Sequence, residues 1–324
     1  MIEQILPGLW RIEVTLPDNP LQAVNSYVLQ EDGRFLVIDT GMNLPVCKND
    51  LASGLRELNV DLDQTDFFIT HMHHDHMGLV SQFAGEKSKV YFNKPESIFI
   101  QQFLVNARWT TLLEFNVAHG FDREEFQKSM PRFSSAVFGS RPITFTLLSE
   151  GDVLKIGDYN LTCIETPGHS PGHICLYEKD KKLLFAGDHI LFDVTPNIMS
   201  YPEMTNTLDL YLKSLEKVYP LDVQLVLPAH RSRMQNHRAR ILEIRQHHED
   251  RLNEAREALE KGARTAYQVA AVISWDIECD GWENFPDAQK YFAVGETIAH
   301  LEHLALLNRA KKTVVDGKIW YLPA

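Results

Sequence analysis

Thr70-His71-Met72-His73-His74-Asp75-His76 is the most informative segment of this 324-residue chain, because it places the pattern HxHxDH directly after an apolar stretch. His71 and His73 are two residues apart, so an extended or turning backbone directs both rings toward one cation. Asp75 and His76 follow where a helix is expected to begin, and they face a second cation. Neutral imidazole and carboxylate together suit Zn²⁺, with Fe²⁺ and Mn²⁺ as alternatives. The motif therefore predicts a site for two metal ions.

Three further apolar segments end in a residue that can bind a metal. Residues 161–164 are followed by Thr166-Pro167-Gly168-His169, residues 183–187 by Asp188, and residues 223–229 by His230. The first motif alone cannot complete two coordination spheres with room for a shared water, so His169, Asp188 and His230 are the candidates for the remaining positions. Because all four apolar segments are expected to be strands, we expect their ends to share one edge of a sheet.

In their order and residue types, these motifs resemble those of the metallo-β-lactamase-fold hydrolases: HxHxDH, a later His, a later Asp and a last His. The resemblance implies an α/β fold with four layers, an αββα sandwich. It implies that His71, His73 and His169 bind one metal, that Asp75, His76 and His230 bind the other, and that Asp188 bridges both. It also implies that Asp39, after the expected strand 36–38, orients a ligand or supports the adjacent loop.

The remaining histidines receive no metal-binding role. His74, His173 and His189 adjoin the candidate ligands, and we expect them to pack against these ligands or to form hydrogen bonds with them. His247 and His248 lie in a strongly charged helical run, and we expect them to be solvated.

The composition is that of a soluble globular enzyme, since 44% of the residues are hydrophobic and 23% are charged, enough for a large core and for more than one domain. No apolar stretch of about 18 residues or more is present, so no membrane span is expected. The first residues, Met1-Ile2-Glu3-Gln4-Ile5, lack the basic and apolar regions of a secretory signal. Four cysteines without a CxxC pair are expected to be reduced. These features predict a cytoplasmic protein.

Residues 1–235 are expected to form the catalytic domain, with a helical insertion at about 95–140. The insertion carries a row of aromatic residues: Phe99, Phe103, Trp109, Phe115, Phe121, Phe126, Phe133 and Phe138. A row at helical spacing is usually part of a hydrophobic core. Insertions at this point of the fold often cover the site, so the alternative is that part of the row lines an acyl or other apolar pocket.

Residues 236–324 are expected to form a second domain. Their pattern predicts helices at 242–261, 263–275 and 295–310, followed by a hairpin at 313–322 with an Asp-Gly turn. This order resembles the winged-helix domain appended to one branch of the metallo-β-lactamase superfamily. The candidate recognition helix, 296–307, is acidic and apolar, and the net charge of −12 repels polyanions. We therefore expect this domain to pack against the catalytic domain or against a second subunit, as in a homodimer.

A cluster of arginines follows the last candidate ligand: Arg231, Arg233, Arg238, Arg240 and Arg245. Two interpretations remain open. The guanidinium groups pair with nearby acids on a helix surface, or they bind a substrate carboxylate, a coenzyme A phosphate or an RNA backbone. The second interpretation keeps a nucleic-acid substrate under consideration despite the acidic net charge.

The expected chemistry follows from the metal pair. Two adjacent cations lower the pKa of a bridging water and hold the resulting hydroxide near a carbonyl or phosphoryl centre. Asp75 is the candidate that passes a proton to the leaving group, and Asp188 is the candidate bridge. An Asp at position 188 argues against a true β-lactamase, because the matching residue in that branch is typically different. The leading prediction is a metal-dependent hydrolase acting on a carboxylic ester, thioester or lactone of a small acyl substrate.

The alternative prediction is a metal-dependent endoribonuclease acting on single-stranded RNA, because the branch with a winged-helix tail includes ribonucleases. A third interpretation is a non-catalytic binding protein. It is disfavoured because none of the candidate ligands has been lost.

Overall fold

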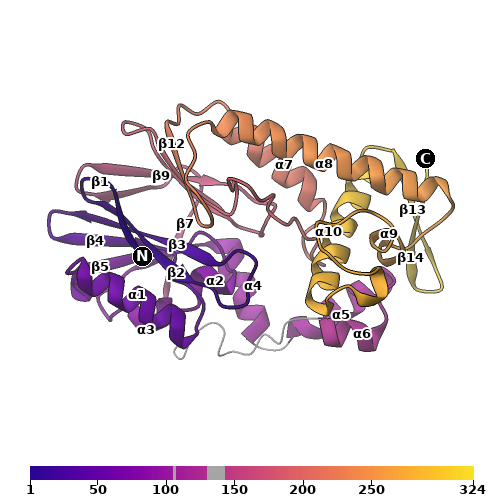
Figure 1. The fold of residues 1–324 in the computed structure, drawn as a ribbon, viewed down its shortest axis with the longest axis horizontal. Coiled ribbons are helices and arrows are strands. Elements are labelled where there is room, and N and C mark those ends of the chain that lie inside the picture. The colour runs from indigo at the N-terminus through magenta and orange to yellow at the C-terminus, as the bar shows by residue number, and fades with distance from the viewer. Residues whose placement is uncertain (105–106, 130–142) are drawn as a thin grey trace. The chain divides into compact units, whose positions relative to one another are not determined.

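The structure is a computed structural model that describes residues 1–104, 107–129 and 143–324 (Figure 1). The chain forms two compact units. Unit 1 comprises Met1–Gln101, Phe133–Pro196 and Val218–Arg240, and unit 2 comprises Gln102–Arg132, Asn197–Lys217 and Ile241–Ala324. The candidate metal ligands all belong to unit 1, so that unit is described first.

Unit 1 contains a seven-stranded mixed sheet whose strands follow one another in chain order. Its strands are β1 (Ile2–Leu6), β2 (Leu9–Thr15), β3 (Ala23–Glu31), β4 (Arg34–Ile38), β5 (Thr65–Phe68), β6 (Val90–Asn93) and β7 (Phe145–Leu148). The pairs from β1 to β4 are antiparallel, and the pairs from β4 to β7 are parallel. In β2 the buried Ile12 and Val14 alternate with the more polar Arg11 and Glu13, as expected for a strand with one face in the core.

Unit 1 also contains a five-stranded sheet with the order β12-β11-β10-β9-β8. Its strands are β8 (Val153–Ile156), β9 (Tyr159–Glu165), β10 (Ile174–Glu178), β11 (Leu183–Gly187) and β12 (Leu225–Pro228). Strand β10 is antiparallel to both β9 and β11, and β11 is parallel to β12. Strands β9, β11 and β12 therefore run in the same direction, and their carboxyl ends lie at one edge of this sheet.

The hydrophobic core of unit 1 combines side chains from both sheets. From the first sheet it takes Leu9, Tyr27, Leu29, Leu36, Ile38, Phe68 and Leu148, and from the second Leu154, Ile156, Tyr159, Leu161, Cys163, Ile174, Leu176, Leu183, Phe185 and Leu227. The rings of Tyr27 and Phe185 meet edge to face, with their centroids 5.5 Å apart. The Tyr27 hydroxyl also donates to Pro228 O at 2.8 Å, which ties β3 to the end of β12.

Short helices follow the strands of the first sheet. Helix α1 (Pro45–Glu57) packs on β2, and a Cβ at Gly54 would lie 2.7 Å from Ile12 Cδ1, so glycine is needed for this close approach. The other elements are η1 (Leu62–Gln64), α2 (His74–Met77), α3 (Val80–Phe83) and α4 (Lys94–Leu104).

Unit 2 is mainly helical. Its elements are α5 (Ala107–Ala118), α6 (Arg123–Ser129), most of α7 (Thr207–Val218) and of α8 (His237–Glu260), α9 (Ala266–Ala270), η3 (Trp282–Asn284), α10 (Asp287–Leu306), β13 (Ala310–Val315) and β14 (Lys318–Pro323). Thr265 caps α9 in a capping box with Gln268. Helix α10 begins well before the expected residue 295. Gly295 lies inside it, where a Cβ would be 2.6 Å from the Met199 Cε.

The aromatic row of the insertion is partly described. Phe99, Phe121 and Phe126 are buried, and Phe126 contacts both Phe121 and Tyr291 of unit 2. The core interpretation is therefore confirmed for Phe121 and Phe126. Phe133 and Phe138 lie outside the described residues, as does the side chain of Phe103.

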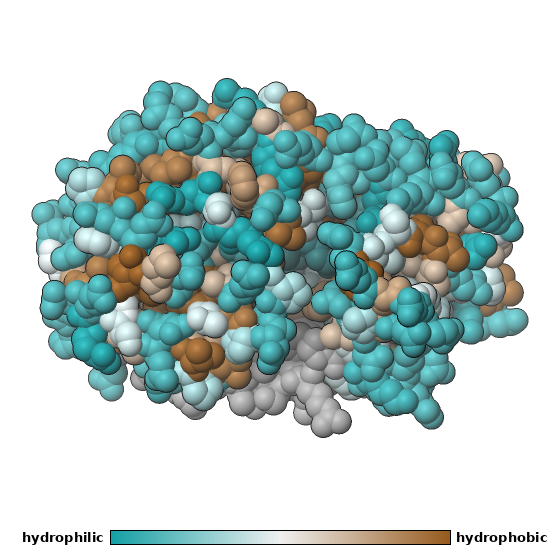
Figure 2. Space-filling model, in the orientation of Figure 1, coloured by the Kyte–Doolittle hydropathy of each residue, from teal (hydrophilic) through white to brown (hydrophobic). Residues whose placement is uncertain are grey.

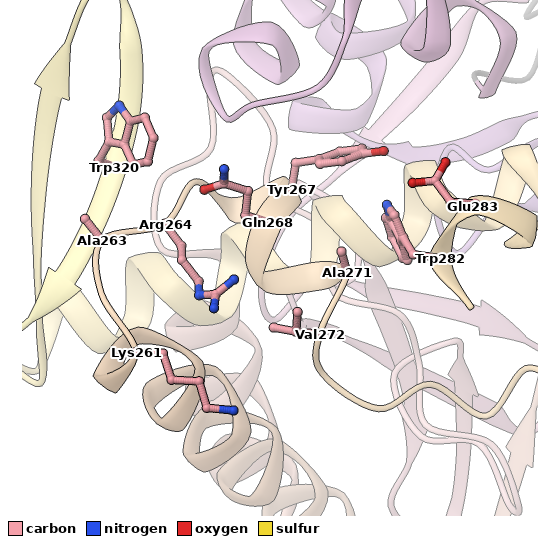
Figure 3. Close-up of a pocket in the computed structure, with 10 residues that line it drawn as sticks. All are labelled: Lys261, Ala263, Arg264, Tyr267, Gln268, Ala271, Val272, Trp282, Glu283 and Trp320. Carbon is pink, nitrogen blue, oxygen red and sulfur yellow. The ribbon is translucent and has the colours of Figure 1, made fainter. Parts of the chain in front are cut away.

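Unit 2 has a surface cavity of about 430 Å³ (Figure 3). Trp320 lies on one side of it and Trp282 on the other, with Arg264 and Gln268 between them, and Lys261 completes its basic part. The face of the molecule in Figure 2 is mostly hydrophilic, with small hydrophobic patches. Within the described ranges, none of the helices combines the length and apolar character needed to cross a bilayer. All four cysteines are free of disulfide bonds.

Candidate metal centre

The HxHxDH motif spans the turn after β5 and the first residues of α2. His71 and His73 precede the helix, and His73 is its N-cap residue with an extended backbone. Asp75 and His76 lie in the first turn of α2, which begins at His74 as the sequence predicts. The change from extended to helical backbone lets four side chains from six consecutive residues turn toward one centre.

The other three candidate ligands follow strands of the five-stranded sheet. His169 follows β9, Asp188 follows β11 directly, and His230 follows β12. The expectation that all four strands share one edge of a single sheet was wrong, because β5 belongs to the seven-stranded sheet. Apolar segments do not reveal which sheet a strand joins. The shared core of the two sheets brings their strand ends together instead.

Three histidines form one side of the centre. His71 Nε2 lies 2.8 Å from His73 Nδ1, and His169 Nε2 lies 3.0 Å from the same His73 atom. These three residues are one of the groups whose donor atoms could hold a metal ion. Asp188 approaches this side through its Oδ2, which is 3.5 Å from His169 Nε2.

A second group of candidate ligands faces the three histidines. His230 Nε2 lies 3.4 Å from Asp75 Oδ2 and 3.4 Å from Asp188 Oδ1, and His76 Nε2 lies 3.6 Å from Asp188 Oδ2. Asp75, His76 and His230 therefore form a second possible metal-binding group. Asp188 is within reach of both groups, so the structure brings all seven candidate residues into one cluster.

The donor atoms of this cluster fit divalent cations. Nε2 of His76, Nε2 of His230 and Oδ1 of Asp188 are buried and have no hydrogen-bond partner within the described part of the chain. Buried polar atoms normally have a hydrogen-bond partner. Two ligands of a tetrahedral zinc ion, each about 2.1 Å from it, lie about 3.4 Å apart. This matches the 3.4 Å between His230 Nε2 and Asp188 Oδ1.

The electrostatics of the cluster also suit cations. Burial and the neighbouring imidazoles hold the pKa of His71 and of His73 well below the usual histidine range, so both rings stay neutral. Burial opposes ionisation of Asp188, but His230 and His76 hold its pKa well below the usual range. Against the effect of burial, Asp188 and Asp75 raise the pKa of His230 to about 10. The carboxylates thus supply negative charge that a bound cation would balance.

Asp39 holds the candidate ligand His76 from behind. Its Oδ2 accepts from His76 Nδ1 at 2.8 Å and from Thr70 Oγ1 at 2.8 Å, and its Oδ1 accepts from Thr70 N at 2.9 Å. The hydrogen on Nδ1 leaves Nε2 of His76 free to bind a metal. His230 is oriented in the same way, because its Nδ1 donates to Ala23 O at 2.7 Å. Asp39 therefore contacts the candidate ligand His76 and the adjacent loop, the two contacts that its expected role requires.

His173 is a hydrogen-bonding neighbour, as expected. Its Nε2 accepts from the backbone N–H of Asp188 at 3.1 Å, and its Nδ1 lies 2.7 Å from Thr166 Oγ1. Gly187 has φ +50, and a Cβ there would lie 2.4 Å from His173 Nε2. His173 and Gly187 thus fix the turn that presents Asp188.

Glu96 is a residue near the centre that the sequence reasoning missed. It lies in the first turn of α4, is fully buried, and contacts both the turn that carries His73 and the turn that carries His169. Burial raises the pKa of Glu96 to about 7. A signal was present in the sequence, since Glu96 closely follows the apolar strand 90–93, as the candidate ligands follow theirs.

The expectation that His248 is solvated was wrong. It is buried in unit 2, with its Nδ1 3.1 Å from His300 Nε2, and His300 Nδ1 donates to Glu296 O at 2.8 Å. The reason is a row of buried residues along the charged helix α8: Ile241, Ile244, His248, Leu252, Ala255 and Leu259. This row has helical spacing, and the surrounding charges concealed it.

The arginines after His230 are engaged within the protein. Arg231 donates to Pro20 O, Arg240 to Leu191 O, and Arg238 to the carbonyls of Tyr219, Pro220 and Leu221. Arg233 pairs with Glu3, and Arg245 pairs with Glu216. These contacts favour the interpretation in which the cluster is paired internally.

Comparison with known proteins agrees with this geometry. The family model of the metallo-beta-lactamase superfamily matches residues 19–230, from just before β3 to the last candidate ligand. The chain belongs to this superfamily. The human protein named acyl-coenzyme A thioesterase MBLAC2 is 29% identical over 213 residues, which cover 64% of this chain and 72% of that protein.

Two solved structures resemble the whole chain. A metallo-beta-lactamase family protein from Thermus thermophilus has 27% identity and a TM-score of 0.82, covering 99% of this chain and 100% of that one. A beta-lactamase domain protein from Burkholderia ambifaria has 26% identity and a TM-score of 0.80, covering 100% of this chain and 95% of that one. The predicted α/β metallo-β-lactamase fold is confirmed, and the protein is a hydrolase of this superfamily.

Proposed function

We propose that the protein hydrolyses a carboxylic ester, thioester or lactone of a small acyl substrate, with two divalent cations in the centre described above. The observation that carries this proposal is the position of Asp188, whose Oδ2 approaches His169 of the three-histidine group and whose two oxygens approach His76 and His230 of the facing group. The name of the human relative makes a thioester the first substrate class to test. Zn²⁺ suits the mixture of imidazole and carboxylate donors best, with iron and manganese as alternatives.

The proposed ligands divide as the clusters do. His71, His73 and His169 would hold one cation, Asp75, His76 and His230 the other, and Asp188 would touch both. When bound, the cations lower the pKa of a water molecule and polarise the substrate carbonyl. Asp39 and Ala23 O fix the tautomers of His76 and His230, so both rings keep Nε2 directed into the centre.

Asp75 is the proposed proton carrier. Its Oδ2 faces His230 and His76, at 3.4 and 3.8 Å, and its other oxygen is then left to accept a proton from the attacking water. Burial opposes ionisation, but His76 and His230 hold the pKa of Asp75 well below the usual range, so the carboxylate is ionised at neutral pH. The same oxygen would deliver the proton to the leaving alkoxide or thiolate.

The endoribonuclease alternative receives less support. The arginines that would bind an RNA backbone are occupied by carbonyls and acids of the protein, and the net charge is −12. RNA cleavage is therefore kept as an outcome of the test and not as a second proposal.

We also propose that residues 236–324 form a winged-helix-like domain of a cytoplasmic protein. The order α8, α9, α10 and the β13–β14 hairpin supports this, as do the positive φ angles of Asp316 and Gly317, which suit a tight two-residue turn. Helix α10 is largely buried, so it offers no basic face to a DNA groove. Apolar residues that remain exposed at its end and in the hairpin, such as Leu306 and Val314, make a homodimer the partner that we propose.

The test is a substrate panel on protein loaded with Zn²⁺ or Mn²⁺. It contains acyl-coenzyme A thioesters, a simple aryl ester, lactones and single-stranded RNA, with Asp188→Ala as the inactive control. We expect hydrolysis of at least one acyl substrate by the loaded protein and none by the control. Cleavage of RNA alone, with every acyl substrate untouched, would replace the proposal with the ribonuclease.

A further inference from the structure

Two turns carry the three-histidine side of the centre, and they come from different sheets. The first holds His71 and His73 after β5, and the second holds His169 between β9 and β10. At their base a backbone hydrogen bond joins them, from Ile174 N to Thr70 O at 3.0 Å. Nearer the ligands, the two turns are connected by a side chain that belongs to neither.

That side chain is Glu96, from the first turn of α4. Its Oε1 accepts from Ser170 Oγ at 2.5 Å and from Gly172 N at 2.6 Å, and its Oε2 accepts from Met72 N at 3.1 Å. Met72 lies between His71 and His73, and Ser170 follows His169. A single carboxylate therefore holds the backbone of both turns next to their ligands.

The contact is built into the fold. A Cβ at Gly172 would lie 2.3 Å from Asn93 Oδ1 and 3.0 Å from Glu96 Cγ, so only glycine lets the second turn approach this closely. Asn93 is buried at the end of β6, and its Nδ2 donates to Glu165 Oε1 at 3.1 Å. The junction of β6 and α4 thus forms a seat for the turn that carries His169.

We propose that Glu96 is a positioning residue, which sets the separation of His73 and His169 and thereby the geometry of the three-histidine metal position. This inference rests on the proposed metal centre. The opposite position has its own supports, Asp39 behind His76 and Ala23 O behind His230. Loss of Glu96 should therefore weaken one of the two metal positions more than the other.

The variant Glu96→Gln tests the proposal with little change in volume. A glutamine has one acceptor oxygen and an NH₂ group. If its oxygen faces Ser170 and Gly172, its NH₂ meets the Met72 N–H, and donor opposes donor. At least one of the three hydrogen bonds is therefore lost. Ser170→Ala removes a single donor and serves as the milder variant if Glu96→Gln does not fold.

Glu178 provides a matched control. It is another buried glutamate that accepts from backbone N–H groups, those of Asn160 at 2.5 Å and Asp180 at 3.0 Å, but it lies at the other end of β10 from the turn that carries His169. Glu178→Gln should disturb the sheet locally and leave the metal positions unchanged.

Metal-free protein is titrated with Zn²⁺ against a competing chelator, and amide hydrogen exchange is measured over residues 166–173 without metal. We expect Glu96→Gln to weaken one binding step by about 10-fold or more, the usual effect of losing a group that orients ligands, and to speed exchange in this turn. Ser170→Ala should do the same to a smaller extent, and Glu178→Gln should do neither.

The proposal is wrong if both binding steps are unchanged in Glu96→Gln, or if both weaken equally, since the effect would then be general. It is also wrong if Ser170→Ala matches wild type in both measurements. Wild-type protein that takes up no metal would overturn the proposed function instead. Exchange in the metal-free turn would then still show whether Glu96 holds it.

Discussion

The substitution Asp39→Asn tests whether the support behind a ligand controls metal affinity. Asp39 has φ +59, a conformation that asparagine adopts readily, so the change adds little backbone strain, whereas alanine would add some. The amide is nearly isosteric with the carboxylate. In one orientation its oxygen accepts from His76 and from Thr70 Oγ1, and its NH₂ group faces the Thr70 N–H. In the other, its oxygen accepts from the Thr70 N–H, and its NH₂ group faces His76 and Thr70 Oγ1. Either orientation loses at least one of the three hydrogen bonds and the negative charge.

The size of the effect follows from the kind of bond that is lost. Hydrogen bonds to a charged group contribute about 1.5–3 kcal/mol. At about 1.4 kcal/mol for each factor of ten, the affinity of the metal position that includes His76 should fall roughly 10- to 100-fold. The fold should survive, because the change is confined to one buried side chain.

The assay is a Zn²⁺ titration of metal-free protein against a chromophoric chelator, with thermal unfolding to check the fold. Asp66→Asn is the control, because Asp66 lies on the adjacent strand β5 and loses the same charge, but it pairs with Arg34 at the surface. Equal zinc affinity in Asp39→Asn and wild type would refute the view that this carboxylate orients His76.

Three further predictions concern other parts of the molecule. Asp188→Ala should lower turnover by orders of magnitude and weaken metal retention, while His74→Ala should be much milder; comparable activity in the two variants would remove the bridging role. Burial raises the pKa of the Glu296 carboxyl to about 7 in the folded protein, whereas its ordinary value is 4.5. As pH rises from about 4.5 to about 7, the unfolded chain loses the carboxyl proton and the folded chain keeps it, so the stability of the wild type falls. In urea unfolding, the free energy of unfolding of Glu296→Gln should rise by up to about 3 kcal/mol relative to wild type across that pH range. A difference between the two proteins that does not change with pH would contradict the raised pKa. The wild-type KM for an acyl ester should be nearly independent of salt and should change little in Arg231→Ala and Arg233→Ala. Steep salt dependence together with weaker binding in these variants would indicate a polyanionic substrate.

The candidate ligands were predictable because they combine uncommon residue types with strand ends. Each apolar segment is followed by one of the candidates His71, His169, Asp188 and His230. The hydrophobic periodicities of helices and strands are enough to locate such segments. The pairing of β5 with one sheet and of the other three strands with the second was not predictable, since it depends on contacts between distant segments.

Other features were hidden by their local surroundings. Glu96 has the same place after an apolar strand as the candidate ligands, but an acid in the first turn of a helix is common. Its hydrogen bonds to residues 72, 170 and 172 exist only in the folded chain. His248 lies among charged residues whose number outweighed the buried row that it continues. Gly295 suggested the start of a helix, but it marks a close contact with Met199 inside one.

The hydrogen bond from His230 to Ala23 O joins residues that are 207 positions apart in the chain. During synthesis, Ala23 leaves the ribosome early. His230 follows only when the whole region that the superfamily model matches, residues 19–230, has been made. A nascent chain that stops between His169 and His230 lacks both the last candidate ligand and the contact that orients it. On the proposed ligand set, such a fragment retains the three histidines of one metal position and never completes the other. Retention of the second ion would then distinguish finished chains from prematurely terminated ones, a property that ribosome-arrested chains of increasing length would reveal.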